Sequence, residues 1–183
     1  MIERSERLSG REERAAVSKP VALVPGVRAL LPRYSSIEDP VAELRAACTS
    51  AAATLGPRVR VVASAYAGFE VGAAVVASLG ASVVESGETG VLVVGNGSAT
   101  RTEKAPGYLD PRAEGFDSDL RAALMLQPVA LASLNLALAS ELWADVPALL
   151  QLPDLVAGPA SVLYDDAPFG VQYWVITWAG STG

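Results

Sequence analysis

GVLVVGNGSATRTEKAPGYLDPRAEGFD, residues 90–117, joins a short apolar run to a long polar segment. Residues 90–94 are apolar and bounded by glycines, which is typical of a buried strand. The polar stretch, as residues 95–117 are called below, begins at the carboxyl end of that strand. Because open α/β sheets bind their ligands at the carboxyl ends of their strands, we expect the functional site in or beside the polar stretch.

The polar stretch begins with Gly-Asn-Gly, residues 95–97, all of which tolerate positive φ and let the backbone present N–H groups to a ligand. Further donors follow at Ser98, Thr100, Arg101, Thr102 and Lys104. Such a set of donors suits a carboxylate or a phosphate. The spacing is not a nucleotide fingerprint, because position 100 breaks GxGxxG and the chain has no GxxxxGK[ST]. A turn with a solvated charged rim is the competing interpretation.

Lys104 is unusual in this chain, which has 12 arginines and only two lysines. The other lysine, Lys19, lies in the N-terminal segment. An ammonium group differs from a guanidinium in shape and in how readily its pKa moves on burial. The choice of lysine at position 104 therefore favours a specific role there.

The composition favours one acidic domain with a full hydrophobic core, since the chain has 183 residues of which 51% are hydrophobic. The formal charge of −6 argues against nucleic acid and against an anionic membrane surface as partners. No apolar run reaches the ~18 residues of a membrane span, and the N-terminus lacks the apolar core of a signal peptide. A single cysteine, Cys48, fits a reducing compartment, so we expect a cytoplasmic protein.

Histidine is absent from the sequence. This excludes His-based zinc and iron sites and nucleophilic systems that use histidine as a base. Acid/base chemistry would fall to Asp, Glu, Tyr or Lys. We expect no bound metal ion and no cofactor.

Residues 1–19 mix five basic with four acidic residues, which predicts a flexible N-terminal arm. Residues 20–180 are expected to form one domain in which strands and helices alternate. Asp39-Pro40 is a helix start, and Gly56-Pro57 ends that helix. The predicted strands are 20–24, 59–65, 83–85 and 90–94, and the predicted helices are 39–55, 71–79, 118–127 and 135–157, the last broken near 145–147.

The C-terminal part departs from this alternation. Residues 161–164 and 171–178 are rich in β-branched and aromatic residues, and the six residues between them are too few for a crossover. We therefore predict an antiparallel hairpin. The fold class is α/β, with a mixed, mostly parallel sheet flanked by helices on both faces. Asp165 and Asp166 next to the turn can be interpreted as a metal or acid/base pair, or as ordinary turn residues.

Residues 131–143 are apolar on two helical faces. Leu131, Leu134, Leu138 and Leu142 form one stripe, and Leu136, Ala139 and Trp143 form another. One stripe can cover the sheet. The other predicts a homo-oligomer, a dimer, unless a second layer of helix within the chain covers it.

The polar stretch, together with LYDDAPFGVQYWVITW at 163–178 and VALVPGVRALLP at 21–32, resembles the B-subunit-like branch of the class III extradiol ring-cleavage dioxygenase (LigB) superfamily, which is related to the Memo proteins. The resemblance runs from about Val21 to Trp178 and implies an α/β sheet flanked by helices. It also implies an Fe(II) site of two histidines and a glutamate, with the histidines in loops after early strands. Those loops read Pro25-Gly26 and 64–66 (Ser-Ala-Tyr) here, so the metal ligands and the dioxygenase activity are not carried over.

Three hypotheses of function follow from the sequence. The first is a metal-free protein that binds a small anion or a partner segment. Its predicted ligand-binding residues are Asn96, Gly97, Ser98, Thr100, Arg101, Lys104, Arg112, Tyr164, Asp165 and Asp166. The second is a metal-independent enzyme in which Lys104, Tyr108 or Asp110 transfers a proton of a carboxylate- or phosphate-bearing substrate. The third is a structural or assembly protein whose polar stretch only packs.

Overall fold

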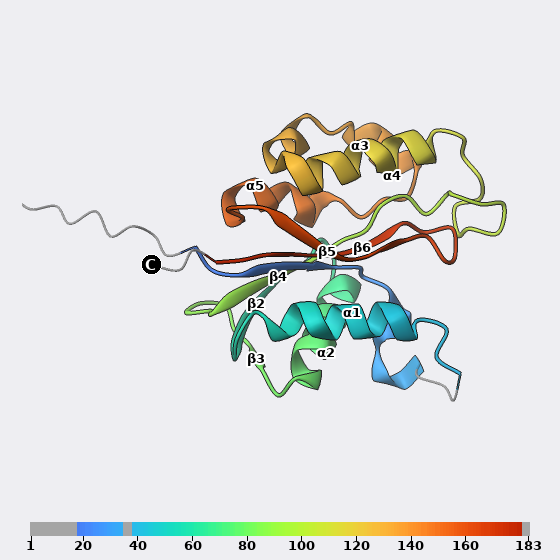
Figure 1. Cartoon of the computed structure of the whole chain (residues 1–183). Helices are drawn as coiled ribbons and strands as arrows, with labels where there is room; N and C mark the ends of the chain where they lie inside the picture. The colour runs from blue at the N-terminus through green and yellow to red at the C-terminus, as the bar shows by residue number, and fades with distance from the viewer. Residues whose placement is uncertain (1–17, 35–37, 181–183) are drawn as a thin grey trace, which may run out of the picture.

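Six strands form one sheet in the order β3-β2-β4-β1-β6-β5 (Figure 1). The computed structural model describes residues 18–34 and 38–180. The strands are β1 (Val21–Val24), β2 (Arg58–Val62), β3 (Ser82–Val83), β4 (Gly90–Val94), β5 (Ala160–Asp166) and β6 (Tyr173–Trp178). The pairs β1–β4, β4–β2 and β2–β3 are parallel. β6 is antiparallel to both β1 and β5. The predicted mostly parallel sheet with a C-terminal hairpin is confirmed.

Helices cover both faces of the sheet (Figure 1). α1 (Ala42–Ala53) and α2 (Tyr66–Ser78) lie on one face, because each connects two parallel strands and must pack back onto the sheet. α3 (Ala113–Leu126), α4 (Leu136–Glu141) and α5 (Leu152–Leu155) lie on the other face. The chain therefore leaves β1 toward one face and leaves β4 toward the opposite one.

The core consists of two layers, one on each side of the sheet. Alternate residues of each central strand point to opposite sides, so Val21 and Leu23 of β1 join one layer while Ala22 and Val24 join the other. Trp174 and Trp178 of β6 fill the layer beneath α3 and α5, and both are almost fully buried. Burial on both faces explains why β1 and β4 read as unbroken apolar runs.

α1 begins at Ala42 with Val41 as its N-cap, so the predicted helix start at Asp39 is three residues too early. Asp39 lies just before the turn that leads into the helix. Its carboxylate accepts a hydrogen bond from the Val41 N–H (3.1 Å) and another from Arg45 Nε (2.7 Å). Arg45 also donates to the carbonyl oxygens of Ala29 and Leu30. These bonds fix the first turn of the helix against the chain that leaves β1.

The helix predicted over residues 135–157, with a break near 145–147, is interrupted over a longer segment than predicted. α4 ends at Glu141, and the 3₁₀ helix η4 (Pro147–Gln151) and α5 follow the interruption. Another 3₁₀ helix, η3 (Pro128–Ser133), precedes α4. Leu134 has an extended backbone, and Trp143 has a positive φ of 58°, so one helix cannot run through either. Leu136 and Trp143 of the second predicted stripe are exposed, but Ala139 is buried. α3 begins five residues before the predicted position 118, and α2 begins five residues before position 71.

The two edges of the sheet differ. β3, at one edge, is only two residues long. β5, at the other edge, has seven residues and a β-bulge between Val162 and Tyr164. Val162 and Leu163 are both exposed there.

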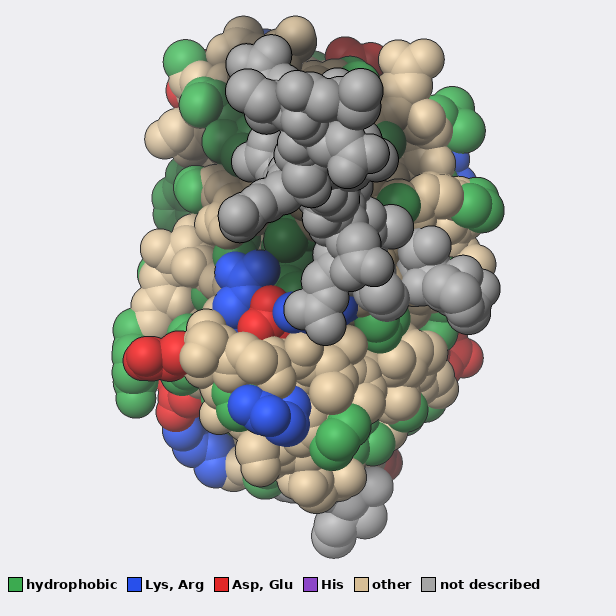
Figure 2. Space-filling view, turned by 90° about the vertical axis from the view of Figure 1, so that its left-hand side faces the viewer, with side chains coloured by type: hydrophobic (Ala, Val, Ile, Leu, Met, Phe, Trp, Pro, Cys, Tyr) green, Lys and Arg blue, Asp and Glu red, His purple; other side chains and the backbone are tan. Residues whose placement is uncertain are grey.

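The face at the amino ends of the parallel strands is shown in Figure 2, where an acidic side chain lies between basic ones. Glu88 lies 3.1 Å from the Lys19 ammonium and 3.6 Å from Arg60. Most of the predicted flexible arm, residues 1–17, lies outside the described residues. Within the described ranges, no helix combines the length and the apolar character that crossing a membrane requires.

Candidate functional site

The candidate site begins at the carboxyl edge of β1 and β4, which are neighbours in the sheet. Because the chain leaves these two strands toward opposite faces, this is the position at which open α/β sheets have their ligand crevice. In this protein, close backbone packing leaves little space at the carboxyl ends of β1 and β4. A Cβ on Gly26 would lie 3.6 Å from Gly68 Cα and 3.8 Å from Asp145 Oδ2, and one on Gly95 would lie 2.6 Å from the Asp145 carbonyl oxygen.

The first residues of the polar stretch are held by backbone hydrogen bonds on both sides. Asn96 exchanges two backbone hydrogen bonds of 3.1 Å with Asp145, which the sequence indicated only as part of a helix break. The Gly97 N–H donates to the Gln172 carbonyl oxygen, and the Gln172 N–H donates to that of Ser98, both at 2.9 Å. The Arg101 N–H donates to the Gly170 carbonyl oxygen at 3.0 Å. The polar stretch therefore lies against residues 167–172, which we call the hairpin loop.

Asp117 is the residue that anchors the polar stretch from within. Its side chain is 2% exposed and accepts hydrogen bonds from the Ser98 N–H (2.7 Å) and the Ser98 hydroxyl (2.6 Å). The Arg101 guanidinium lies 3.4 Å from the same carboxylate. Asp117 belongs to α3, so these bonds tie the start of the polar stretch to the helix that ends it.

The predicted donors at the start of the stretch are used for its own packing. Ser98 is fully buried and donates to Asp117, and Thr100 is 2% exposed. The Thr100 hydroxyl has no hydrogen-bond partner in the described part of the chain. A Cβ on Gly97 would lie 2.6 Å from an Asp117 oxygen and 2.9 Å from Trp174. Glycine is required at position 97 for this close approach.

Burial raises the pKa of Asp117 above its ordinary value, and the hydrogen bonds from Ser98 and the charge of Arg101 oppose this only in part. The folded protein therefore binds this proton at a higher pH than the unfolded chain, whose Asp titrates near about 3.9. As the pH falls from 7 through the folded pKa, we expect the wild type to gain stability relative to Asp117→Asn, which cannot titrate. Urea unfolding of both proteins between pH 7 and 4 measures this difference. If the wild type instead loses stability relative to Asp117→Asn as the pH falls, the pKa of Asp117 is not raised in the folded protein.

The predicted ligand-binding cations and aspartates do not pair with one another. In the described part of the chain, neither Asp165 nor Asp166 forms an ion pair with Arg101, Lys104 or Arg112. Arg101 pairs with Asp117 instead, and Arg112 pairs with both Asp110 and Glu141 at 2.7 Å. Asp165 pairs with Arg121 of α3 at 2.5 Å. Sequence spacing gives no indication of the pairs Arg112–Glu141 and Arg121–Asp165, because they join segments far apart in the chain.

The remaining predicted residues do not converge. Tyr164 is half-buried on β5, on the face covered by α1, and burial raises the pKa of its hydroxyl. Asp166 accepts from the Ala167 N–H, an ordinary turn bond. Tyr108 has a positive φ of 62° and is exposed. Hydrogen bonds from Arg112 lower the pKa of Asp110 to about 2, so its carboxylate is a weak base at neutral pH.

Lys104 differs from the other cations of the polar stretch, because no ion pair joins it to any residue within 18–34 and 38–180. It lines an open hollow of about 530 Å³ between the polar stretch and the hairpin loop. The other residues of this hollow are Thr102, Glu103, Ala167, Pro168, Phe169 and Gly170. Phe169 is 45% exposed, so one wall of the hollow is apolar.

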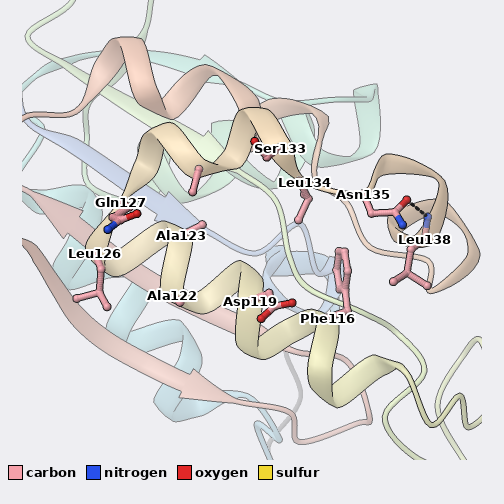
Figure 3. A pocket seen from close by; sticks show the side chains of 11 residues that line it. Phe116, Asp119, Ala122, Ala123, Leu126, Gln127, Ser133, Leu134, Asn135 and Leu138 are labelled. Carbon is pink, nitrogen blue, oxygen red and sulfur yellow. Dashed lines mark hydrogen bonds between the residues drawn. The ribbon is translucent and has the colours of Figure 1, made fainter.

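A second hollow, also about 530 Å³, lies on the other side of α3 (Figure 3). It is bounded by α3, η3 and the start of α4, and nothing in the sequence indicated it. No group of three or more Asp, Glu or Cys side chains within the described ranges is placed to hold a metal ion.

Comparisons with known proteins assign the chain to no family. No known protein family matches the chain, and no curated protein matches it at a significant level. The resemblance to the ring-cleavage dioxygenase superfamily therefore stays a prediction.

Proposed function

We propose that the protein binds a small anion through Lys104, without a metal ion, in the hollow between the polar stretch and the hairpin loop. The observation that carries this proposal is the ammonium group of Lys104, which has no ion-pair partner among the described residues and lies beside an open hollow of about 530 Å³. The neighbouring cations, Arg101 and Arg112, are each already paired with carboxylates. A carboxylate or a phosphate is the ligand that such an ammonium group would bind.

The remaining walls of the hollow restrict the ligand further. Thr102 adds a hydroxyl donor beside Lys104, and Pro168 and Phe169 add apolar surface. Glu103 brings a negative charge into the same hollow, which disfavours ligands of high negative charge. The proposed ligand therefore carries a single anionic group and an apolar part.

The enzyme hypothesis has less support. Its three candidates, Lys104, Tyr108 and Asp110, do not share one hollow, since only Lys104 lines the hollow beside the hairpin loop. The Asp110 carboxylate is held by Arg112. A proton transfer needs an acid or base of matched pKa within reach of the substrate, and this geometry does not supply one.

Lys104→Ala tests the proposed function, with acetate and inorganic phosphate as the anionic probes. Titration of either probe into the wild type should shift the amide resonances of residues 102–104 and 167–170 and should saturate. In Lys104→Ala these shifts should be lost, while the free energy of unfolding changes by less than about 0.5 kcal/mol, because the residue is exposed and has no ion-pair partner in the part of the chain that the structure describes.

Lys104→Arg and Arg112→Ala are the matched controls for this experiment. Lys104→Arg keeps the charge and should keep part of the binding. Arg112→Ala removes a cation that lies outside the hollow and should leave binding unchanged. Saturable shifts of equal size in Lys104→Ala and in the wild type would show that Lys104 is not the anion-binding group.

A further inference from the structure

The two walls of the anion-binding hollow, as the hollow beside Lys104 is called below, meet at Gly170. The Arg101 N–H donates to the Gly170 carbonyl oxygen at 3.0 Å. A Cβ on Gly170 would lie 2.5 Å from Thr102 Oγ1 and 2.6 Å from Ala105 Cβ, so the polar stretch and the hairpin loop touch there. Thr102 and Gly170 both line the hollow. A shift of one segment against the other therefore changes the shape of the hollow.

Each wall of the hollow is a tight turn with its own backbone hydrogen bond. The Ala105 N–H donates to the Thr102 carbonyl oxygen at 3.0 Å, and the Gly170 N–H donates to that of Ala167 at 3.1 Å. Lys104 lies in the first turn, and the apolar wall lies in the second. A bond inside a turn fixes the shape of that turn but not its distance from the other turn. The distance between the walls must therefore be set by contacts outside both turns.

Those contacts start with a ladder of backbone hydrogen bonds between the polar stretch and the hairpin loop. The Gln172 N–H donates to the Ser98 carbonyl oxygen at 2.9 Å, and the bond from Arg101 to Gly170 follows it along the chain. The ladder ends next to Thr102, where the first wall begins. The position of Ser98 and Arg101 thus decides where that wall lies.

Asp117 holds both Ser98 and Arg101, although it does not line the hollow. Its buried carboxylate accepts the Ser98 N–H at 2.7 Å and the Ser98 hydroxyl at 2.6 Å. The Arg101 guanidinium lies 3.4 Å from the oxygen that also accepts this hydroxyl. One side chain of α3 therefore supports the ladder at two points, behind the residues that would contact a ligand.

Positioning and charge make opposite predictions for the loss of this carboxylate. The Arg101 side chain is 25% exposed, so without the negative charge of Asp117 its own charge would favour a nearby anion. Loss of the hydrogen bonds would instead let the wall that carries Lys104 move, which weakens a site whose groups must act together. The direction of the change in affinity therefore separates the two effects.

We propose that Asp117 is the positioning residue of the anion-binding hollow, which it acts on through Ser98 and Arg101. This proposal rests on the proposed function of Lys104. A bound anion fixes the two walls, and Asp117 fixes the segment behind one of them. The two effects must support each other in both directions, because coupling between two sites is reciprocal.

Titration of acetate or inorganic phosphate into the full chain, followed by amide resonances, tests the proposal. Asp117→Asn should raise the dissociation constant about tenfold, and Ser98→Ala, which changes no charge, should raise it about threefold. Asp39→Asn is the matched control. Asp39 also accepts a backbone N–H, that of Val41, and pairs with an arginine, Arg45, but it lies beside α1. Its variant should bind the probes like the wild type.

Amide hydrogen exchange gives a readout that a purely structural carboxylate would not change. Saturating acetate should slow the exchange of the Ser98 and Arg101 amides in the wild type, although neither residue lines the hollow. The Val41 amide, bonded to Asp39, should exchange at the same rate with and without acetate. Exchange at Ser98 and Arg101 that does not respond to the ligand would overturn the proposal.

The titrations separate a failure of this proposal from a failure of the proposed function. If a folded Asp117→Asn protein binds the probes as tightly as the wild type, or more tightly, Asp117 is not a positioning residue and the proposed function stands. If the wild type shows no saturable shifts, both are overturned. Circular dichroism shows whether each variant is folded. Should Asp117→Asn not fold, Ser98→Ala decides the outcome in the same way.

Discussion

Replacing Asp117 with alanine should lower the free energy of unfolding by about 3–5 kcal/mol. The carboxylate is buried and accepts both the N–H and the hydroxyl hydrogen bond of Ser98, and Arg101 lies beside it. Alanine leaves the two donors of Ser98 and the partly buried Arg101 guanidinium without this acceptor. Urea unfolding of the wild type and the variant measures the loss.

Asp165→Ala is the control for this measurement, because Asp165 is also paired with an arginine but lies at the surface. Its loss should not exceed about 1 kcal/mol. If Asp117→Ala is as stable as Asp165→Ala, the buried carboxylate does not hold the polar stretch. Asp117→Asn keeps one acceptor for Ser98 and should lie between the wild type and the alanine variant.

Gly90→Ala should be about as damaging, with an expected loss of about 3 kcal/mol or more. A Cβ at position 90 would lie 2.6 Å from the Leu55 carbonyl oxygen and 2.7 Å from the Leu55 Cα. Both atoms belong to the backbone, and β4 is held between β2 and β1. Neither β4 nor the backbone at Leu55 can therefore shift without a large cost in free energy. The thermal midpoint and the urea midpoint should both fall.

Gly115→Ala provides the contrast, since a Cβ there meets no atom within 4 Å and the residue lies inside α3. Alanine favours helix, so this variant should gain about 0.5–1 kcal/mol. A Gly90→Ala protein that unfolds at the wild-type urea concentration would show that the chain at Leu55 moves freely.

The central strands could be predicted because their burial on both faces leaves a direct trace in the sequence. Residues 90–94 are all buried, and the sequence shows this as an apolar run between glycines. The hairpin was predictable for another reason, since a short connection excludes a parallel crossover. Both arguments depend on local sequence only.

Residues 128–157 were not predictable in the same way. Leucines recur there at helical spacing, but periodicity does not show that Leu134 is extended or that Trp143 has a positive φ. Short 3₁₀ helices present similar spacings over one turn. The tertiary packing of this layer decides where each piece ends.

The core-facing position of Asp117 could have been deduced from the sequence if the predicted helix had begun at Ala113. Ala113, Phe116, Leu120 and Leu124 form the buried face of α3, and Asp117 occupies the same face. A carboxylate in a core-facing position needs buried donors. Which donors these are could not be deduced, because Ser98 and Arg101 meet Asp117 only after the polar stretch folds back on α3.

The uneven edges of the sheet bear on whether many copies of the chain could stack into filaments. A long open strand can add further strands without limit, and natural proteins protect such edges with bulges and charges. β5 has both protections, since a bulge interrupts it after Val162 and its last two residues are Asp165 and Asp166. The acidic pair, which in the sequence suggested a ligand site, is thus placed to oppose edge-to-edge aggregation. At the opposite edge of the sheet, β3 has only two residues and offers little backbone for a further strand to pair with.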